Sequence, residues 1–519
     1  MSVCRNHKRP AHEFKLYKKR WTLLLLFALM QIISSFSFAS LGQVSDVYVN
    51  YFKVNYWQVD WASLACPLGM CVAAPVLACL SYMKIMPLKK MTIFSAAGLV
   101  FSNTCIVLAP VSSKAFSLVV IGQLINGFSA GALYTMRPSF AVHWFPDSEV
   151  GTAIGVGTTG IGIGGILGFI LSPFVLHKQS SDVPKTLQES TFNRPVRHHG
   201  KNRTALNGND TLGFDDVLEH DESTRQHVDV TSFLKLYLPA LILSAVVLVL
   251  LIIFMQDKPP TPPSRTAMAH QRNSSVDAQP RFSDFLATTL HLSKNTTCIA
   301  AMLIYGFVLR TALVEYTMMS QIVSVMKPSL SLSQADTIGG YIMVTLMIGY
   351  FVGSLVGGRV VDRFKRHSRV ASISIFCTLV STVGLLISFK LSNLIGLYVF
   401  NGLYGAFMFI AVVVLHRITS EATFPLDAIF VSAWLTAVQT GLGCMLASVG
   451  RGIFNRFSAT GVLSLQCFAM LLSLLISVLI KEQNHYLGIS AVEGTQFSPS
   501  KDKSADNCNQ TSTLKLNNP

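Results

Sequence analysis

Charged side chains are scarce in this chain. Of its 519 residues, only 13% are Asp, Glu, Lys or Arg, whereas 51% are hydrophobic. A soluble protein of this size would carry about a quarter charged residues. The composition therefore excludes an ordinary soluble globular protein and predicts an integral membrane protein.

Several chemical signatures are also absent from the sequence. The ten cysteines lie in apolar runs, at the edges of such runs, or in the terminal tails, so no disulfide framework is indicated. No ATP-binding signature is present, and we expect no cofactor and assign no residue as a metal ligand. We therefore expect a protein that is not an enzyme and performs no covalent chemistry.

The net charge of +15 would suit a nucleic-acid partner. The cations, however, gather at the ends of apolar runs and form no stripe interleaved with aromatic residues. This placement is typical of membrane topology. We therefore expect a lipid bilayer around the chain and no nucleic-acid partner. Nothing in the sequence indicates an oligomeric state.

Long hydrophobic runs are abundant, and each is near the ~20 residues that a spanning helix needs. The first run follows a polar, basic start and is too long for a cleavable signal peptide. The sequence thus predicts an all-α membrane protein with twelve transmembrane helices, at roughly 21–43, 58–83, 91–110, 116–140, 150–176, 234–255, 297–324, 335–361, 371–389, 392–416, 428–450 and 459–480.

The distribution of cations predicts the orientation of these helices. Loops on one side carry clusters such as Lys84, Lys89 and Lys90, whereas the short loops on the other side carry few cations. Cationic loops stay in the cytoplasm, so both tails are expected there. We expect a cytoplasmic tail (1–20), a six-helix half (21–255) with an outside loop (177–232), a cytoplasmic linker (256–294), a second half (295–480) and a disordered cytoplasmic tail (481–519).

The loop 177–232 carries two acceptor triplets for N-linked glycans, beginning at Asn202 and Asn209. Such triplets are used only on the outside or in a lumen, so we expect a glycoprotein. The same loop contains four histidines, which either bind a metal or haem or are simply solvated; solvation is the commoner case. Their positions are His198, His199, His220 and His227.

The stretch Gly353–Arg369, GSLVGGRVVDRFKRHSR, leaves an apolar run and enters a basic cluster. An acid at a helix exit can cap a neighbouring helix and hold two helices together. Gly358, Asp362, Arg363 and Arg366 resemble the Gly-x-x-x-Asp-Arg-x-x-Arg signature of the major facilitator superfamily, which implies a gating role. The alternative is a simple basic stop after a membrane helix.

Further short motifs narrow this resemblance, and their order and spacing matter more than any one of them. They resemble the feline leukaemia virus subgroup C receptor family of solute carriers, from about Lys15 to the last helix. The motifs begin at Arg20, Val59, Gly122, Trp144, Glu149, Lys258, Tyr305 and Glu421.

The resemblance implies the major facilitator fold, with two six-helix halves, and transport of a small solute by alternating access. The solute would be a choline-like or ethanolamine-like amine. Alternatives are haem or another amphipathic solute, or a membrane receptor that transports nothing. We expect the plasma membrane as its location, with an endolysosomal membrane as the alternative.

The resemblance also implies site residues. An aromatic ring attracts an ammonium group through its face, and Phe38 stands where the family has a Trp. The family's seventh-helix Tyr falls at Leu313, with Tyr316 about one turn further on. The eleventh-helix Gln corresponds to Gln439, or to Thr440 if the register slips by one. Gln321 is a further candidate in the seventh helix, whereas the family's fifth-helix Asn-Gln pair falls at Ile161–Gly162.

Charged residues inside the spans form the last signal. They are Arg137 in the fourth helix, Arg310 and Glu315 in the seventh, and Arg417 near the inner end of the tenth. A charge within a bilayer costs several kcal/mol unless it faces a polar cavity or a partner. Either Glu315 faces the solute path, attracting a cation or carrying a proton, or it forms a structural pair with Arg137.

The fifth helix is dense in glycine, which would suit a phosphate-binding loop in a soluble protein. Inside an apolar span, small residues serve close helix packing, and they also let a helix bend. We expect packing first and gating second, at Gly151, Gly155, Gly157, Gly160, Gly162, Gly164, Gly165 and Gly168.

Overall fold

The computed structural model describes residues 14–42, 44–177, 230–264, 267–268, 281–364, 366–423, 426 and 428–480. Throughout these ranges the regular secondary structure is helical, and eleven helices are long and apolar enough to cross a membrane. The predicted glycan acceptors Asn202 and Asn209, the four loop histidines and the C-terminal tail lie outside the described residues. The all-α fold predicted from the hydrophobic runs is confirmed.

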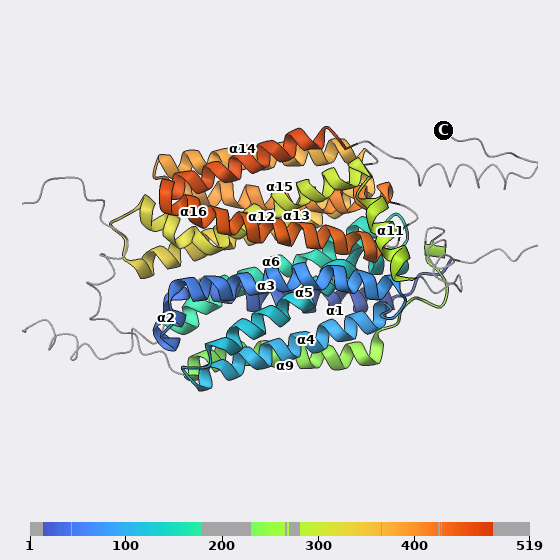
Figure 1. Ribbon diagram of the computed structural model, residues 1–519, viewed down its shortest axis with the longest axis horizontal. Helices are drawn as coiled ribbons and strands as arrows, with labels where there is room; N and C mark the ends of the chain where they lie inside the picture. Colours follow the sequence, from blue (N-terminus) through green and yellow to red (C-terminus); the bar gives the residue numbers. More distant parts are fainter. Residues whose placement is uncertain are drawn as a thin grey trace, which may run out of the picture. The chain divides into compact units, whose positions relative to one another are not determined.

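Two groups of helices make up the bundle (Figure 1). The first comprises α1 (Lys19–Gly42), α3 (Tyr56–Tyr82), α4 (Leu88–Leu108), α5 (Phe116–Trp144), α6 (Val150–His177) and α9 (Val230–Phe254). The second comprises α12 (Thr296–Met326), α13 (Leu332–Arg363), α14 (His367–Lys390), α15 (Leu394–Ala422) and α16 (Ala428–Ser477). We call the face where α1 begins and α9 ends the linker side, and the opposite face the loop side.

The helix α16 contains two of the predicted spans. Its 50 residues would measure about 75 Å as one straight helix, more than twice the ~30 Å of a bilayer core. Ser458 interrupts it with φ 58° and ψ −166°, and the chain reverses there. Ser477 returns to the linker side, where its hydroxyl lies 3.1 Å from that of Ser372 in α14. With this division the observed spans match the twelve predicted ones.

Two short helices were not predicted. The helix α2 (Ser45–Phe52) follows α1 on the loop side, and its Tyr48 hydroxyl lies 2.7 Å from the hydroxyl of Tyr237 in α9. The helix α11 (Phe282–Leu292) lies within the segment that we had interpreted as a linker. Both are too short to span a bilayer, so a search for long apolar runs passes over them.

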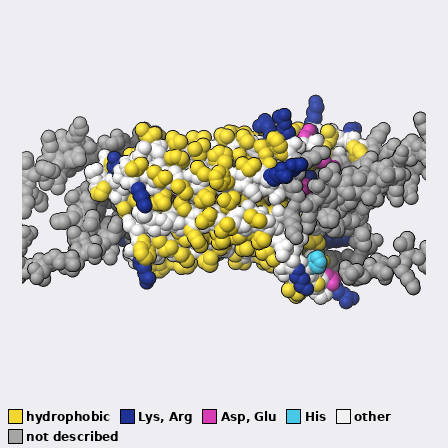
Figure 2. Space-filling model, turned by 90° about the horizontal axis from the view of Figure 1, so that it is seen from above, with side chains coloured by type: hydrophobic (Ala, Val, Ile, Leu, Met, Phe, Trp, Pro, Cys, Tyr) yellow, Lys and Arg dark blue, Asp and Glu magenta, His cyan; other side chains and the backbone are white. Residues whose placement is uncertain are grey.

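The surface of the bundle is that of a membrane protein. Apolar side chains cover the middle of the face seen in Figure 2, and Lys and Arg gather toward its two ends, mostly on the linker side. The most apolar window of α9 is only 28% buried by protein, whereas that of α12 is 82% buried. Thus α9 faces lipid, whereas α12 lies in the centre of the bundle.

Glycines of α6 let this helix pack closely against helices of both halves. A Cβ on Gly155 would collide with the backbone oxygen of Ser354 in α13, and one on Gly164 would collide with that of Ile32 in α1. Since a side chain at either position would force the helices apart, these glycines allow close packing. The packing role predicted for the glycine-rich helix is confirmed.

Candidate functional site

A cavity lies between the two halves. Its wall is formed by α1, α3, α5 and α6 from the first half and by α12, α13 and α15 from the second. The centres of water-sized spheres can occupy about 70 Å³ of it.

The spacing of residues on two helices explains which side chains reach the cavity. Gln31, Ser34, Ser35 and Phe38 recur on α1 at intervals of three and four residues, and Leu309, Leu313 and Tyr316 do so on α12. Residues with this spacing share one face of a helix. The α1 face therefore carries polar groups and one aromatic ring toward the cavity, whereas the α12 face carries two leucines and a tyrosine.

The structure brings two predicted site residues together at one end of the cavity. The ring centroids of Phe38 and Tyr316 are 5.6 Å apart, and Phe169 of α6 lies 5.4 Å from Tyr316. Phe38 and Tyr316 both line the cavity and are only partly buried. Ile161 and Leu313 are also in the wall, so the positions where the family has polar side chains are apolar here.

Arg137 lies beside the opposite end of the cavity wall. Its guanidinium donates to Gln31 Oε1 at 3.1 Å and to Thr158 Oγ1 at 2.9 Å. It also lies 4.8 Å from the centre of the Tyr134 ring. Gln31 and Tyr134 line the cavity. Arg137 is 4% exposed, so one layer of side chains separates its charge from the cavity.

A His–Tyr pair of the second half lies near Arg137. The hydroxyl of Tyr305 and Nε2 of His416 are 3.0 Å apart, and both side chains are buried. Arg137 is close enough to interact electrostatically with each of them. His416 was not among the predicted site residues, although its position inside a span next to Arg417 is a signal that could have found it.

Glu315 does not line the cavity. Its Oε1 accepts a hydrogen bond from Gln466 Nε2 at 2.6 Å, and Oε2 has no hydrogen-bond partner. No ion pair among the described residues joins Glu315 to Arg137. In this conformation Glu315 neither faces the solute path nor pairs with Arg137. The side chain of Arg310 lies outside the described residues.

Gln439 is fully buried, and neither polar atom of its amide has a hydrogen-bond partner. A Cβ on Gly306 of α12 would lie 3.4 Å from the Gln439 Cα, so the side chain starts beside the central helix. Thr440, the alternative register, donates to the Thr436 carbonyl at 2.7 Å. A buried amide without partners costs about 1–3 kcal/mol, which makes Gln439 the better candidate for a polar ligand.

On the loop side, a side-chain network joins the halves. Arg451 of α16 donates to Asp60 Oδ2 of α3 at 2.8 Å and to Gln321 Oε1 of α12 at 2.6 Å. Gln321 thus belongs to this network and is not part of the cavity wall described above. We call the trio Asp60, Gln321 and Arg451 the loop-side closure.

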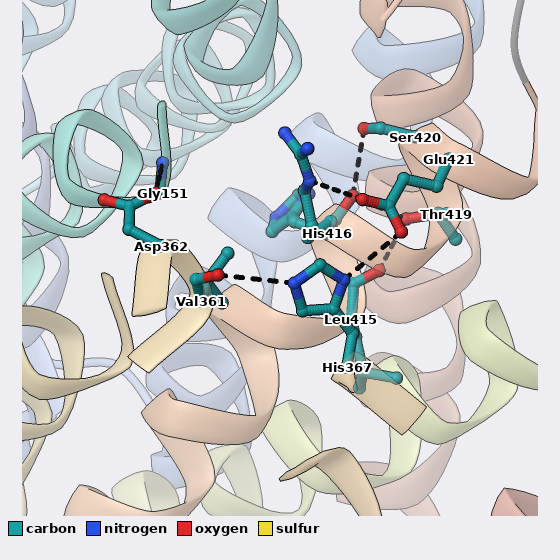
Figure 3. A network of polar contacts seen from close by, with 10 residues as sticks. Gly151, Val361, Asp362, His367, Leu415, His416, Thr419, Ser420 and Glu421 are labelled. Carbon is teal, nitrogen blue, oxygen red and sulfur yellow. Dashed lines mark hydrogen bonds and ion pairs between the residues drawn. The ribbon is translucent and has the colours of Figure 1, made fainter. Parts of the chain in front are cut away.

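On the linker side, Asp362 of α13 binds the beginning of α6 in the other half. Its carboxylate accepts from the backbone N–H of Gly151 at 2.9 Å, and from the N–H and hydroxyl of Thr152 at 2.8 and 2.6 Å. A helix N-terminus favours a negative charge. Figure 3 shows Asp362 directed at Gly151. The expectation that Asp362 caps a neighbouring helix is confirmed.

The other residues of the signature lie around this contact. Gly358 allows α6 to approach, since a Cβ there would lie 2.8 Å from the Gly151 oxygen. Arg363 and Arg366 are exposed. Their gating role remains a prediction.

Aromatic side chains add to the contact between the halves on the linker side. The rings of Tyr82 (α3) and Phe430 (α16) are 5.7 Å apart, and Phe285 of α11 lies 5.8 and 5.6 Å from them. The Tyr82 hydroxyl lies 3.1 Å from that of Thr288. Together with Asp362 bound to α6, this cluster forms what we call the linker-side closure.

A second charged network on the linker side stays within one half. Glu421 binds Arg417 at 2.7 Å and His367 at 3.2 Å, and the other nitrogen of His367 lies 3.3 Å from the Val361 oxygen (Figure 3). These contacts join α13, α14 and α15 to one another. They are therefore a natural control for the contact of Asp362 with α6.

Comparisons with known proteins agree with this architecture. A family model described as Major Facilitator Superfamily matches residues 27–181. The choline/ethanolamine transporter flvcr2a of Danio rerio is 22% identical, over 90% of this chain and 87% of that protein. The choline/ethanolamine transporter FLVCR1 of Felis catus is 21% identical, over 93% of this chain and 77% of that protein.

Solved structures show the same fold at lower sequence identity. The major facilitator transporter FucP in its outward conformation is 15% identical and has a TM-score of 0.61, covering 90% of this chain and all of FucP. The proton:xylose symporter XylE is 12% identical and has a TM-score of 0.56, covering 88% and 94% of the two chains. At these identities the likeness concerns the fold alone.

Proposed function

We propose that this chain, which belongs to the major facilitator superfamily and resembles its choline/ethanolamine transporters, carries a small organic amine across a membrane by alternating access. The observation that carries the proposal is a small cavity between the halves with an aromatic pair in its wall, Phe38 and Tyr316. Rings attract an ammonium group by about 2 kcal/mol or more where water is excluded. The relatives named above as choline/ethanolamine transporters support an amine as the solute.

The size of the cavity favours a small solute. A cavity volume of about 70 Å³ suits a solute of the size of choline or ethanolamine better than one as large as haem. This size favours an amine over the haem alternative.

The closures on the two sides of the cavity support alternating access over a static receptor. Each closure joins one half to the other, so opening one side requires its contacts to break while those of the other side hold. Transport then follows from rocking of the two halves around a central site. Gly358, Asp362, Arg363 and Arg366 belong to the linker side of this motion.

The plasma membrane is the proposed location, with Asn202 and Asn209 on its outer face. The concentration of Lys and Arg on the linker side of the described surface (Figure 2) supports this orientation, since cationic segments stay in the cytoplasm. The relatives, which are named as transporters of amine solutes, are compatible with this location.

Uptake of radiolabelled choline and ethanolamine by cells that express the chain tests the function. Phe38→Ala should raise the solute concentration that half-saturates uptake by roughly tenfold. Phe38→Trp should leave this concentration unchanged or lower it, because the face of a Trp ring attracts a cation more strongly. Surface protein is measured in parallel. Half-saturation unchanged in both variants would remove Phe38 from the site, and uptake no higher than in control cells would contradict amine transport.

A further inference from the structure

The charge beside the cavity is positive. Arg137 is 4% exposed, lies within a membrane span, and makes its side-chain hydrogen bonds to the neutral groups of Gln31 and Thr158. No ion pair of the described residues includes it. Five acids in or next to the described spans bind elsewhere: Asp60, Glu149, Glu315, Asp362 and Glu421.

An isolated cation in this position needs a partner of opposite charge. Burying a charge is costly unless it is paired, and charged residues inside membrane spans commonly face a substrate path. Arg137 fits this pattern, because the two side chains that cover it, Gln31 and Tyr134, themselves line the cavity. A ligand in the cavity can supply the missing negative charge.

The groups around Arg137 suit an anion. Gln31 turns its oxygen toward the guanidinium, which leaves its NH₂ as a donor at the cavity wall. Tyr305 and His416 of the other half lie near Arg137 and are hydrogen-bonded to each other. The charge of Arg137 lies directly behind Gln31 and Tyr134, so a carboxylate matches this end of the cavity better than a hydroxyl does.

The aromatic pair and the Arg137 end lie at different levels. Phe38 follows Gln31 by seven residues on the same face of α1, a rise of about 10 Å. One small solute can therefore present an ammonium to the rings and an anionic group to Gln31 and Arg137. A solute with an ammonium alone would lie near an uncompensated cation.

We infer that the solute is a zwitterion, in which an ammonium group binds against the rings of Phe38 and Tyr316 and a carboxylate binds at Gln31, close to the charge of Arg137. This inference rests on the proposed function and narrows its solute class. It assigns Arg137 as the residue that decides between a zwitterionic amine and a purely cationic one.

Choline and glycine betaine form a matched pair of probes, because both carry a trimethylammonium group and they differ in a hydroxyl or a carboxylate. Their binding to the purified full-length protein is measured by thermal stabilisation and their uptake by radiolabel. We expect glycine betaine to half-saturate the protein at a concentration about tenfold or more below that of choline. The ratio in the unmodified protein tests the inference without any variant.

Variants then locate the carboxylate. Arg137→Gln should weaken the binding of glycine betaine about tenfold or more and leave the binding of choline unchanged or stronger. Arg137→Lys keeps the charge but loses the planar guanidinium, so its effect should be intermediate. Phe38→Ala is the matched control and should weaken both probes by a similar factor. If Arg137→Gln does not fold, Gln31→Leu tests the same end and should weaken glycine betaine selectively.

The outcomes separate this inference from the proposed function. Choline binding as tightly as glycine betaine, or an Arg137→Gln effect equal for both, would overturn the zwitterion and leave amine transport standing. If 3-hydroxypropionate, a carboxylate without an ammonium, binds while neither amine does, both the amine function and the zwitterion are overturned. Binding of none of the three probes would overturn both as well.

Discussion

On the loop side the two halves are joined by side chains, whereas on the linker side a side chain of one half binds the backbone of the other. Arg451 donates hydrogen bonds to Asp60 and Gln321, and the side chains of Arg451 and Asp60 are each about one-third exposed. Asp362 instead caps the first turn of α6. An exposed ion pair contributes about 1 kcal/mol or less, whereas a hydrogen bond to a charged group contributes about 1.5–3 kcal/mol.

The difference indicates which closure tolerates substitution better. A pair of side chains keeps its opposite charges when the two residues are swapped. A carboxylate that binds backbone N–H groups has no such substitute, because the positive end of α6 cannot be reversed by mutation. We therefore expect the linker side to be the less tolerant closure.

The largest effect is expected for Asp362→Asn. It removes the charge that binds the start of α6, so uptake per surface molecule should fall about tenfold or more, in line with the loss of one charged hydrogen bond. Surface biotinylation provides the amount of protein. Glu421→Gln is the control, because its contacts stay within one half; an equal fall in that variant would contradict a role of Asp362 in gating.

A smaller effect is expected for Arg451→Gln, about two- to fivefold on uptake, since the pair is partly exposed. Opening of the loop side should raise the labelling of Cys66, which lines the cavity, by a membrane-impermeant thiol reagent added from outside. Cys66→Ser identifies the labelled site. The double change Asp60→Arg with Arg451→Asp should restore both the uptake and the Cys66 labelling of the unmodified protein. If the labelling in Arg451→Gln stays at the level of the unmodified protein, the pair does not close this side.

A still smaller effect is expected for Tyr82→Phe, which removes the hydroxyl contact to Thr288 and keeps the ring against Phe430. Uptake should change by less than about twofold, because one neutral hydrogen bond contributes about 0.5–1.5 kcal/mol and water can replace it. Tyr82→Ala, which also removes the ring, should lower uptake further. Equal effects of the two variants would mean that the ring contributes nothing to the linker-side closure.

The last test measures glycosylation and not uptake, and it determines which closure faces outward. Treatment of the expressed protein with a glycosidase should increase its gel mobility, and the double change of Asn202 and Asn209 to Gln should abolish that shift. A glycan on Asn273 or Asn295 would instead place the linker side outside and exchange the two closures in the predictions above.

The hydrophobic runs were sufficient to predict the fold, because the bilayer imposes one length on every spanning helix. They failed where that constraint does not apply, at α2 and α11. The candidate site was predicted in part. Phe38 and Tyr316 do meet in the cavity, whereas Gln321 lies in the loop-side closure and Glu315 contacts Gln466.

The sequence by itself determined that this chain spans a membrane many times, which apolar segments cross it, and that Asp362 ends a helix with a charge able to cap another. These properties depend on composition and on local spacing. Only the tertiary structure decided which helix Asp362 caps, that His416 lies near Arg137, and that Glu315 and Arg137 are not paired. Those facts depend on how helices from the two halves pack and rotate against each other, and a turn of about 100° per residue moves a side chain from the cavity to the interior of one half.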